Sequence, residues 1–263
     1  AANSLYDAAY VEYFTGVRPE YIPSWCGDAD NSFNLQEVWS GCVLNDTHIY
    51  KPSKEYSLFV PYRTAAWAEH GGDIDETHVL YKDLKKAMDG FEEKYGKSPP
   101  ETKHSLHEMS NHRPEEYKKY ISLIFLPYQV STMSFFEFFR QDIPILVPSV
   151  RLLTEWQLKH GMVSNRVYGE PKYLPDVFEK FAGRQSNLDI PYPNDNTREA
   201  LEYWLPYSDF YSFDECLIYD SFEEMYEILE NTDFNALSQR MAIRNEKERN
   251  RILVMWDLVM RKM

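Results

Sequence analysis

The central part of the chain alternates short apolar runs with segments of helical spacing. Residues 56–60, 121–126 and 143–147 are apolar runs with the length that is typical of buried strands. Between the last two runs, apolar residues recur at helical spacing over residues 132–139. A strand, a helix and a second strand in this order form a βαβ crossover, which is the unit of a parallel sheet covered by helices.

The same patterns place the remaining elements. They predict further helices at residues 6–14, 75–95, 114 onward, 222–229 and 237–260, and further strands at residues 104–109 and 216–219. On the helix over residues 75–95, one apolar face is expected to hold Val79, Leu80, Leu84, Met88 and Phe91. Residues 151–207 contain many Gly and Pro residues and are predicted to form a long irregular excursion.

These elements predict an α/β fold with a Rossmann-like, mostly parallel sheet, flanking helices, the long excursion and a C-terminal helix. We expect residues 1–55 to form a lead-in helix and an irregular connector. Residues 56–263 are expected to form the sheet domain, with the C-terminal helix included.

Composition and charge narrow the class of partner. The chain is 43% hydrophobic and 16% aromatic, and its 28 basic and 42 acidic residues give a net charge of −14. A negative balance of this size argues against binding to nucleic acid or to an anionic membrane surface. No apolar stretch approaches the ~20 residues of a membrane span. Cys26, Cys42 and Cys216 are widely spaced and predict no zinc site, although a Cys26–Cys42 bridge stays open.

Candidate chemistry lies in the loops that follow the predicted strands, since ligands of parallel sheets bind at the carboxyl ends of the strands. Arg63 follows the first strand, and Ser131 and Thr132 open the helix over residues 132–139. Hydroxyls beside the free N–H groups of a helix start suit a phosphate, and Arg63 would add a planar fork of donors. The plainer alternative is that Ser131 and Thr132 only cap the helix and that Arg63 pairs with a surface carboxylate.

Glu137 stands inside a run of four Phe residues at 135–139. A carboxylate is costly to bury without a partner, and a pair of sugar hydroxyls would be one such partner. The alternative is that Glu137 lies on the solvent face of the helix while the four Phe side chains pack inward.

The spacing around Glu137 resembles a known family. Seven residues separate Gln129 from Glu137, and Pro144 follows Glu137 by seven positions at the start of the next strand. This resembles the donor-binding half of GT-B glycosyltransferases. The resemblance implies that Glu137 holds ribose hydroxyls. It also implies that Ser131, Thr132 and Met133 hold the donor diphosphate and that Arg63 corresponds to the basic residue that follows the first strand in the family. Members of the retaining branch have Glu at both ends of the spacer, whereas Gln129 stands at the first position here.

The resemblance implies transfer of a sugar from a nucleotide-diphosphate sugar to a glycan or other acceptor, with neither a metal nor a cofactor beyond this co-substrate. It also implies an acceptor-binding N-terminal domain, which is not evident in this chain. We expect a cytoplasmic protein, or a Golgi lumenal one if the chain is a fragment. One alternative is a non-catalytic, degenerate interaction module. A weaker one is a metal-dependent GT-A enzyme that uses Asp28 and Asp30.

Overall fold

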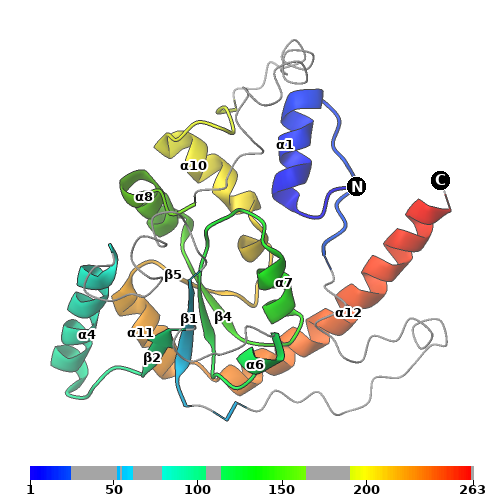
Figure 1. Cartoon of the computed structure of the whole chain (residues 1–263). Coiled ribbons are helices and arrows are strands. Elements are labelled where there is room, and N and C mark those ends of the chain that lie inside the picture. The colour runs from blue at the N-terminus through cyan, green and yellow to red at the C-terminus, as the bar shows by residue number, and fades with distance from the viewer. Residues whose placement is uncertain (25–51, 54, 62–78, 105–113, 164–189, 262–263) are drawn as a thin grey trace.

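The chain folds around one parallel sheet, as the computed structural model in Figure 1 shows. The structure describes residues 1–24, 52–53, 55–61, 79–104, 114–163 and 190–261. The strands are β1 (Ser57–Pro61), β2 (Thr102–His104), β3 (Leu123–Leu126), β4 (Ile145–Pro148) and β5 (Leu217–Tyr219). They lie in the order β2-β1-β3-β4-β5, and every pairing is parallel. The predicted α/β class with a mostly parallel sheet is confirmed at this level.

The central strands are apolar along their whole length because both faces of the sheet are covered. Every residue of β3 and β4 is buried. Leu58 of β1 pairs with Leu123 of β3, which in turn pairs with Ile145 of β4. The predicted βαβ crossover is confirmed, with α7 (Met133–Phe139) connecting β3 to β4.

The helices form two layers. From β1 the chain continues to β2 on one side of β1 in the sheet, and from β3 it continues to β4 in the opposite direction. Because both crossovers are expected to be right-handed, their connecting helices lie on opposite faces of the sheet. Helix α4 (Tyr81–Tyr95) packs against α11 (Phe222–Asn231), and α7 lies on the other side of the sheet, beside α6 (Pro114–Tyr117) (Figure 1). Helix α12 (Phe234–Met260) closes the described chain.

The predicted irregular excursion over residues 151–207 is wrong at its two ends, residues 151–160 and 198–207, which are helical. Residues 150–160 form the helix α8 (Val150–His160), and later residues form α10 (Arg198–Trp204) and the 3-10 turn η3 (Leu205–Tyr207). Ser149 caps α8, while Gly161 ends it with a positive φ of 67°. That glycine, read as a sign of irregular chain, is a helix C-cap. Residues 164–189 lie outside the described part.

Some predicted boundaries shift as well. Helix α4 begins at Tyr81, and residues 75–78 lie outside the described part. Leu80, Leu84 and Phe91 are buried as expected, but Val79 and Met88 are exposed. Strand β2 is centred earlier than the predicted residues 104–109, of which 105–109 are not described.

Helix α1 (Leu5–Thr15) confirms the predicted N-terminal helix, with Gly16 as its left-handed C-cap. It packs on the elements near α10: the Tyr6 ring lies 5.9 Å from that of Trp204, and the Tyr10 hydroxyl donates to Asn194 at 3.0 Å. The division of the chain at residue 55 stays a prediction. Among the described helices, none has the length and apolarity that crossing a membrane requires.

Candidate functional site

The order of the strands locates the candidate site. The strand order reverses beside β1, and in doubly wound sheets ligands bind at the carboxyl ends of the strands that flank such a reversal. Here those strands are β1 and β3. Residues 62–78, which follow β1 and include Arg63, lie outside the described part. The described half of the switch point is therefore the loop of residues 127–132 between β3 and α7, which we call the β3–α7 loop.

The β3–α7 loop contains the predicted residues Gln129, Ser131 and Thr132, and Met133 opens the helix. Thr132 is buried, has an extended backbone and accepts a hydrogen bond from the Phe135 N–H at 3.4 Å through Oγ1, so it caps α7 as the plainer alternative states. Met133 is 53% exposed, and Gln129 and Ser131 are partly exposed. The loop is therefore accessible through Gln129, Ser131 and Met133 rather than through the side chain of Thr132.

Asp209 lies against this loop, and the sequence analysis did not single it out. Its backbone N–H donates to the Val130 carbonyl at 3.1 Å, and the residue is only 1% exposed. Neither carboxyl oxygen makes a hydrogen bond of ordinary length and angle, although the Ser131 hydroxyl and the Thr132 N–H lie close enough to lower the carboxyl pKa. Burial outweighs them and raises the pKa of Asp209 to about 8. At neutral pH this carboxyl is mostly protonated.

Glu137 is neither fully buried nor fully exposed, so it matches neither of the two alternatives given for it completely. The side chains of Phe135, Phe136, Phe138 and Phe139 are all buried, as the solvent-face alternative predicts. Glu137 itself is partly buried and lies near Tyr117 of α6. Burial first, and the charges of Tyr120 and Glu137 after it, raise the pKa of Tyr117 to about 12. The carboxylate thus sits beside α6, in the second half of the short helix α7.

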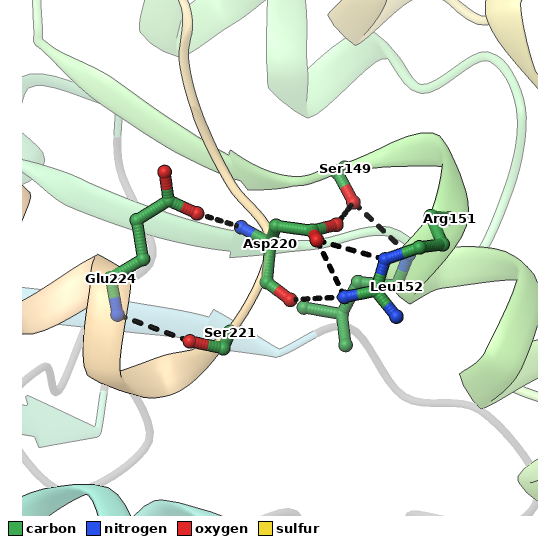
Figure 2. A network of polar contacts seen from close by, with 6 residues as sticks. All are labelled: Ser149, Arg151, Leu152, Asp220, Ser221 and Glu224. Atoms are coloured by element: carbon green, nitrogen blue, oxygen red, sulfur yellow. Dashed lines mark hydrogen bonds and ion pairs between the residues drawn. The ribbon is translucent and has the colours of Figure 1, made fainter.

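A polar network joins the carboxyl ends of β4 and β5 (Figure 2). Arg151 donates to Oδ2 of Asp220 from Nε at 2.8 Å and from Nη2 at 2.6 Å, and Nη2 also donates to the Asp220 carbonyl at 2.9 Å. Ser149 donates to the other oxygen of Asp220 and caps α8 by accepting from the Leu152 N–H at 3.0 Å. The loops after two neighbouring strands are thereby fastened together.

The network also reaches the start of α11. The N–H of Asp220 donates to Oε2 of Glu224 at 2.6 Å, and the N–H of Glu224 donates to the Ser221 hydroxyl at 3.1 Å. Ser221 caps α11, and the helix predicted over residues 222–229 is confirmed. Two helix starts, those of α8 and α11, therefore meet at the same edge of the sheet.

Arg151 stands in the first turn of α8, where the helix dipole disfavours a positive charge. Asp220 offsets this, and its hydrogen bond to Arg151 holds the pKa of the Asp220 carboxyl below its usual value. Arg151 and Asp220 are 57% and 48% exposed, and Nη1 of the guanidinium points away from Asp220 (Figure 2). This arginine was missed because residue 151 was assigned to the irregular excursion. A serine directly after an apolar strand was the available signal for a helix start.

Metal ligation finds no support in the described part of the chain, where no group of three His, Cys, Asp or Glu side chains is placed to hold an ion. Asp28 and Asp30 lie outside that part, so the metal-dependent alternative is not addressed there. Cys216 is buried with a free thiol, and Cys26 and Cys42 are not described.

The chain matches no protein-family model, and comparisons with curated proteins and with solved structures give no match either. The class that the fold defines is an α/β protein with a Rossmann-like, all-parallel five-stranded sheet.

Proposed function

We propose that this chain is the donor-binding part of a glycosyltransferase that uses a nucleotide-diphosphate sugar. The observation that carries the proposal is the sheet order β2-β1-β3-β4-β5, which reverses beside the strand pair where the sequence spacing puts the donor residues. Gln129 lies in the β3–α7 loop, Glu137 lies on α7, and Pro144 directly precedes β4, which supports this reading of the spacing.

In this proposal the nucleotide lies across the carboxyl ends of β1, β3 and β4. Glu137 binds ribose hydroxyls, and the partly exposed Ser131 and the exposed Met133 border the diphosphate. Arg151, with its outward Nη1, and Arg63, from the sequence alone, supply positive charge to the departing diphosphate. Such groups would stabilise the leaving group electrostatically and without an obligatory metal.

Asp209 sets a condition on this assignment. Its carboxyl lies beside the Ser131 hydroxyl and the Thr132 N–H, which are the groups that the family resemblance assigns to the diphosphate. A carboxylate there would repel a phosphate, whereas a protonated carboxyl would not. The proposal therefore requires Asp209 to be uncharged when the donor binds.

The second candidate function is that of a non-catalytic interaction module with the same fold. The identity of residue 129, which is Gln, favours this candidate. An amide stands where the retaining branch of the family has a carboxylate. Hydrolysis of the donor distinguishes the two functions, because a glycosyltransferase releases free sugar slowly from its donor and a binding module releases none.

The proposal is tested by calorimetry with UDP, GDP, ADP and CMP, each with and without EDTA. We expect one diphosphate to bind in EDTA, and its affinity to fall at least about tenfold in Glu137→Ala and in Arg151→Ala. Matched controls are Glu93→Ala on the exposed face of α4 and Arg261→Ala at the C-cap of α12, where Arg261 pairs with Asp257. Absence of binding would contradict the proposal, and binding only with a divalent metal would favour the Asp28/Asp30 alternative.

A further inference from the structure

Asp209 stands where three separate segments of the chain meet. It begins the 3-10 turn η4 (Asp209–Tyr211), and its N–H bonds to Val130 of the β3–α7 loop. The third segment is the N-terminal one, residues 1–24, whose Asp7 and Tyr21 both lie close enough to interact electrostatically with the Asp209 carboxyl. The carboxyl is thus enclosed between segments that are far apart in the sequence.

The N-terminal segment is held in place by its own contacts. The N–H of Ala2 donates to the Glu20 carbonyl at 2.7 Å, and the N–H of Ile22 donates to the Ala2 carbonyl at 2.9 Å. Arg140, at the end of α7, donates to the Ser24 carbonyl at 3.4 Å. The segment therefore spans from α1 to the end of α7 and passes beside Asp209.

The polar groups that face the Asp209 carboxyl compensate a negative charge only in part, because burial outweighs them. The β3–α7 loop supplies the Ser131 hydroxyl and the Thr132 N–H, while α1 supplies the like charge of Asp7. The phenol of Tyr21 also interacts with Asp209. Burial is the main cause that raises the pKa of Tyr21 to about 12. The charged groups Arg140 of α7 and Glu248 and Arg251 of α12 act on Tyr21, and none of them is among the groups that shift Asp209.

We propose that Asp209 is a proton-dependent positioning residue, which in its uncharged form holds the β3–α7 loop against η4 and the N-terminal segment and which on losing its proton releases that junction. An uncharged carboxyl can stay buried in this place, where the Asp209 N–H holds Val130 of the loop. Among the described residues, no cation is one of the groups that shift Asp209, and a carboxylate in the same place faces Asp7, so hydration of the charge favours opening of the junction.

The consequence for the site is regulation by pH. The β3–α7 loop is the described half of the switch point, so a released loop no longer presents Ser131 and Met133 in a fixed geometry. This consequence for ligand binding rests on the proposed function, whereas the release of the loop does not.

The direct test is amide hydrogen exchange of the full chain at pH 6 and at pH 9, corrected for the intrinsic pH dependence of exchange. The relevant reporters are the N–H groups of Asp209 and Thr132, the first of which donates to Val130. We expect their protection in the wild type to fall at least about tenfold between the two pH values, with a midpoint close to that of Asp209 titration. In Asp209→Asn, which keeps the shape and removes the titration, we expect no such fall.

Two further variants keep the test decisive. Asp220→Asn removes an exposed carboxyl of another loop and is expected to leave the pH response of Thr132 as in the wild type. Asp7→Asn removes the neighbouring like charge, which raises the pKa of Asp209, and is therefore expected to move the midpoint to lower pH. Constant protection in the wild type, or an equal loss in Asp209→Asn, would overturn the proposal.

A binding experiment separates this inference from the proposed function. If a nucleoside diphosphate binds, its affinity is expected to fall between pH 6 and pH 9 in the wild type and to stay level in Asp209→Asn. If no nucleotide binds at any pH while the loop still responds, the proposed function fails and the inference stands. If a nucleotide binds equally at both pH values and the loop is unresponsive, only the inference fails.

Discussion

Arg140 donates a hydrogen bond from Nη1 to Oδ1 of Asn245 at 2.8 Å, and both side chains are buried. Asn245 completes its bonding by donating to the Phe139 carbonyl at 2.8 Å and to Oδ1 of Asp142 at 2.7 Å. This one asparagine therefore joins the end of α7 to α12 and accepts a hydrogen bond from a buried arginine. The candidate site depends on it indirectly, since α7 carries Glu137.

Replacing Asn245 by Ala should destabilise the fold strongly. The change leaves the Arg140 guanidinium and the Phe139 carbonyl without this partner in a buried place, and such losses cost roughly 2–4 kcal/mol together. The free energy of unfolding from urea titration measures the cost. Lys94→Ala is the control, because it removes only exposed contacts, an ion pair with Glu227 and a contact with the Tyr95 ring, and should cost much less. Equal effects of the two variants would contradict the role given to Asn245.

Asp209→Asn should stabilise the protein increasingly as the pH rises. Burial raises the pKa of Asp209 to about 8, from a value near 3.8 when the chain is unfolded. Between these two values the folded state binds the proton and the unfolded state does not, so the wild type loses stability as the pH increases. Asparagine has no proton to lose. The stability advantage of the variant should therefore grow by roughly 2–3 kcal/mol between pH 6 and pH 9.

Urea titrations of the wild type and Asp209→Asn at several pH values measure this difference. A constant difference across the range would show that Asp209 does not titrate in the buried place described for it.

Asp220→Asn should show the opposite dependence on pH. Arg151 lowers the pKa of Asp220, so this carboxylate contributes stability above its unfolded pKa and loses it as the pH falls through the folded value. Because both partners are about half exposed, the contribution is small. Thermal unfolding between pH 2.5 and pH 7 is the measurement. The variant should be slightly less stable than the wild type near neutrality and equal to it at the acid end.

Cys216 should resist thiol reagents in the folded protein. Its side chain is buried, and burial together with the nearby charge of Glu215 raises the pKa of the thiol well above its usual value, so little thiolate forms. In a Cys26→Ser/Cys42→Ser variant, a chromogenic disulfide reagent at pH 8 should detect no thiol until urea unfolds the chain. Rapid labelling of the native variant would place Cys216 outside the core.

The elements around the switch point could be predicted from the sequence because their signals are local. Continuous apolar runs identify β3 and β4, and Thr132 before the Phe run identifies the start of α7. The helix α8 was missed although its signal was local too: Ser149 caps it and the apolar residues Leu153 and Trp156 recur on its buried face. The many Gly and Pro residues of the wider segment 151–207 led to the prediction of an irregular chain, although the apolar residues of α8 have helical spacing.

The contacts that define the site could not be predicted in this way. Asp209 meets Val130, and Arg151 meets Asp220, only after the sheet has assembled. Periodicity reports which face of an element is buried and contains no information on which distant loop lies beside it. In the sequence Asp209 is one polar residue among aromatic ones, and its raised pKa arises mainly from burial by other segments.

The most direct test of the central claim is to map nucleotide binding on the isotope-labelled protein by NMR, with UDP, GDP and ADP added in turn at pH 7 in EDTA. The account predicts that one diphosphate shifts the amide signals of Ser131, Met133 and Arg151 and leaves those of the last turns of α12 unchanged. Signals that stay unchanged with every nucleotide, or shifts confined to α12, would contradict a donor site at the carboxyl ends of β3 and β4.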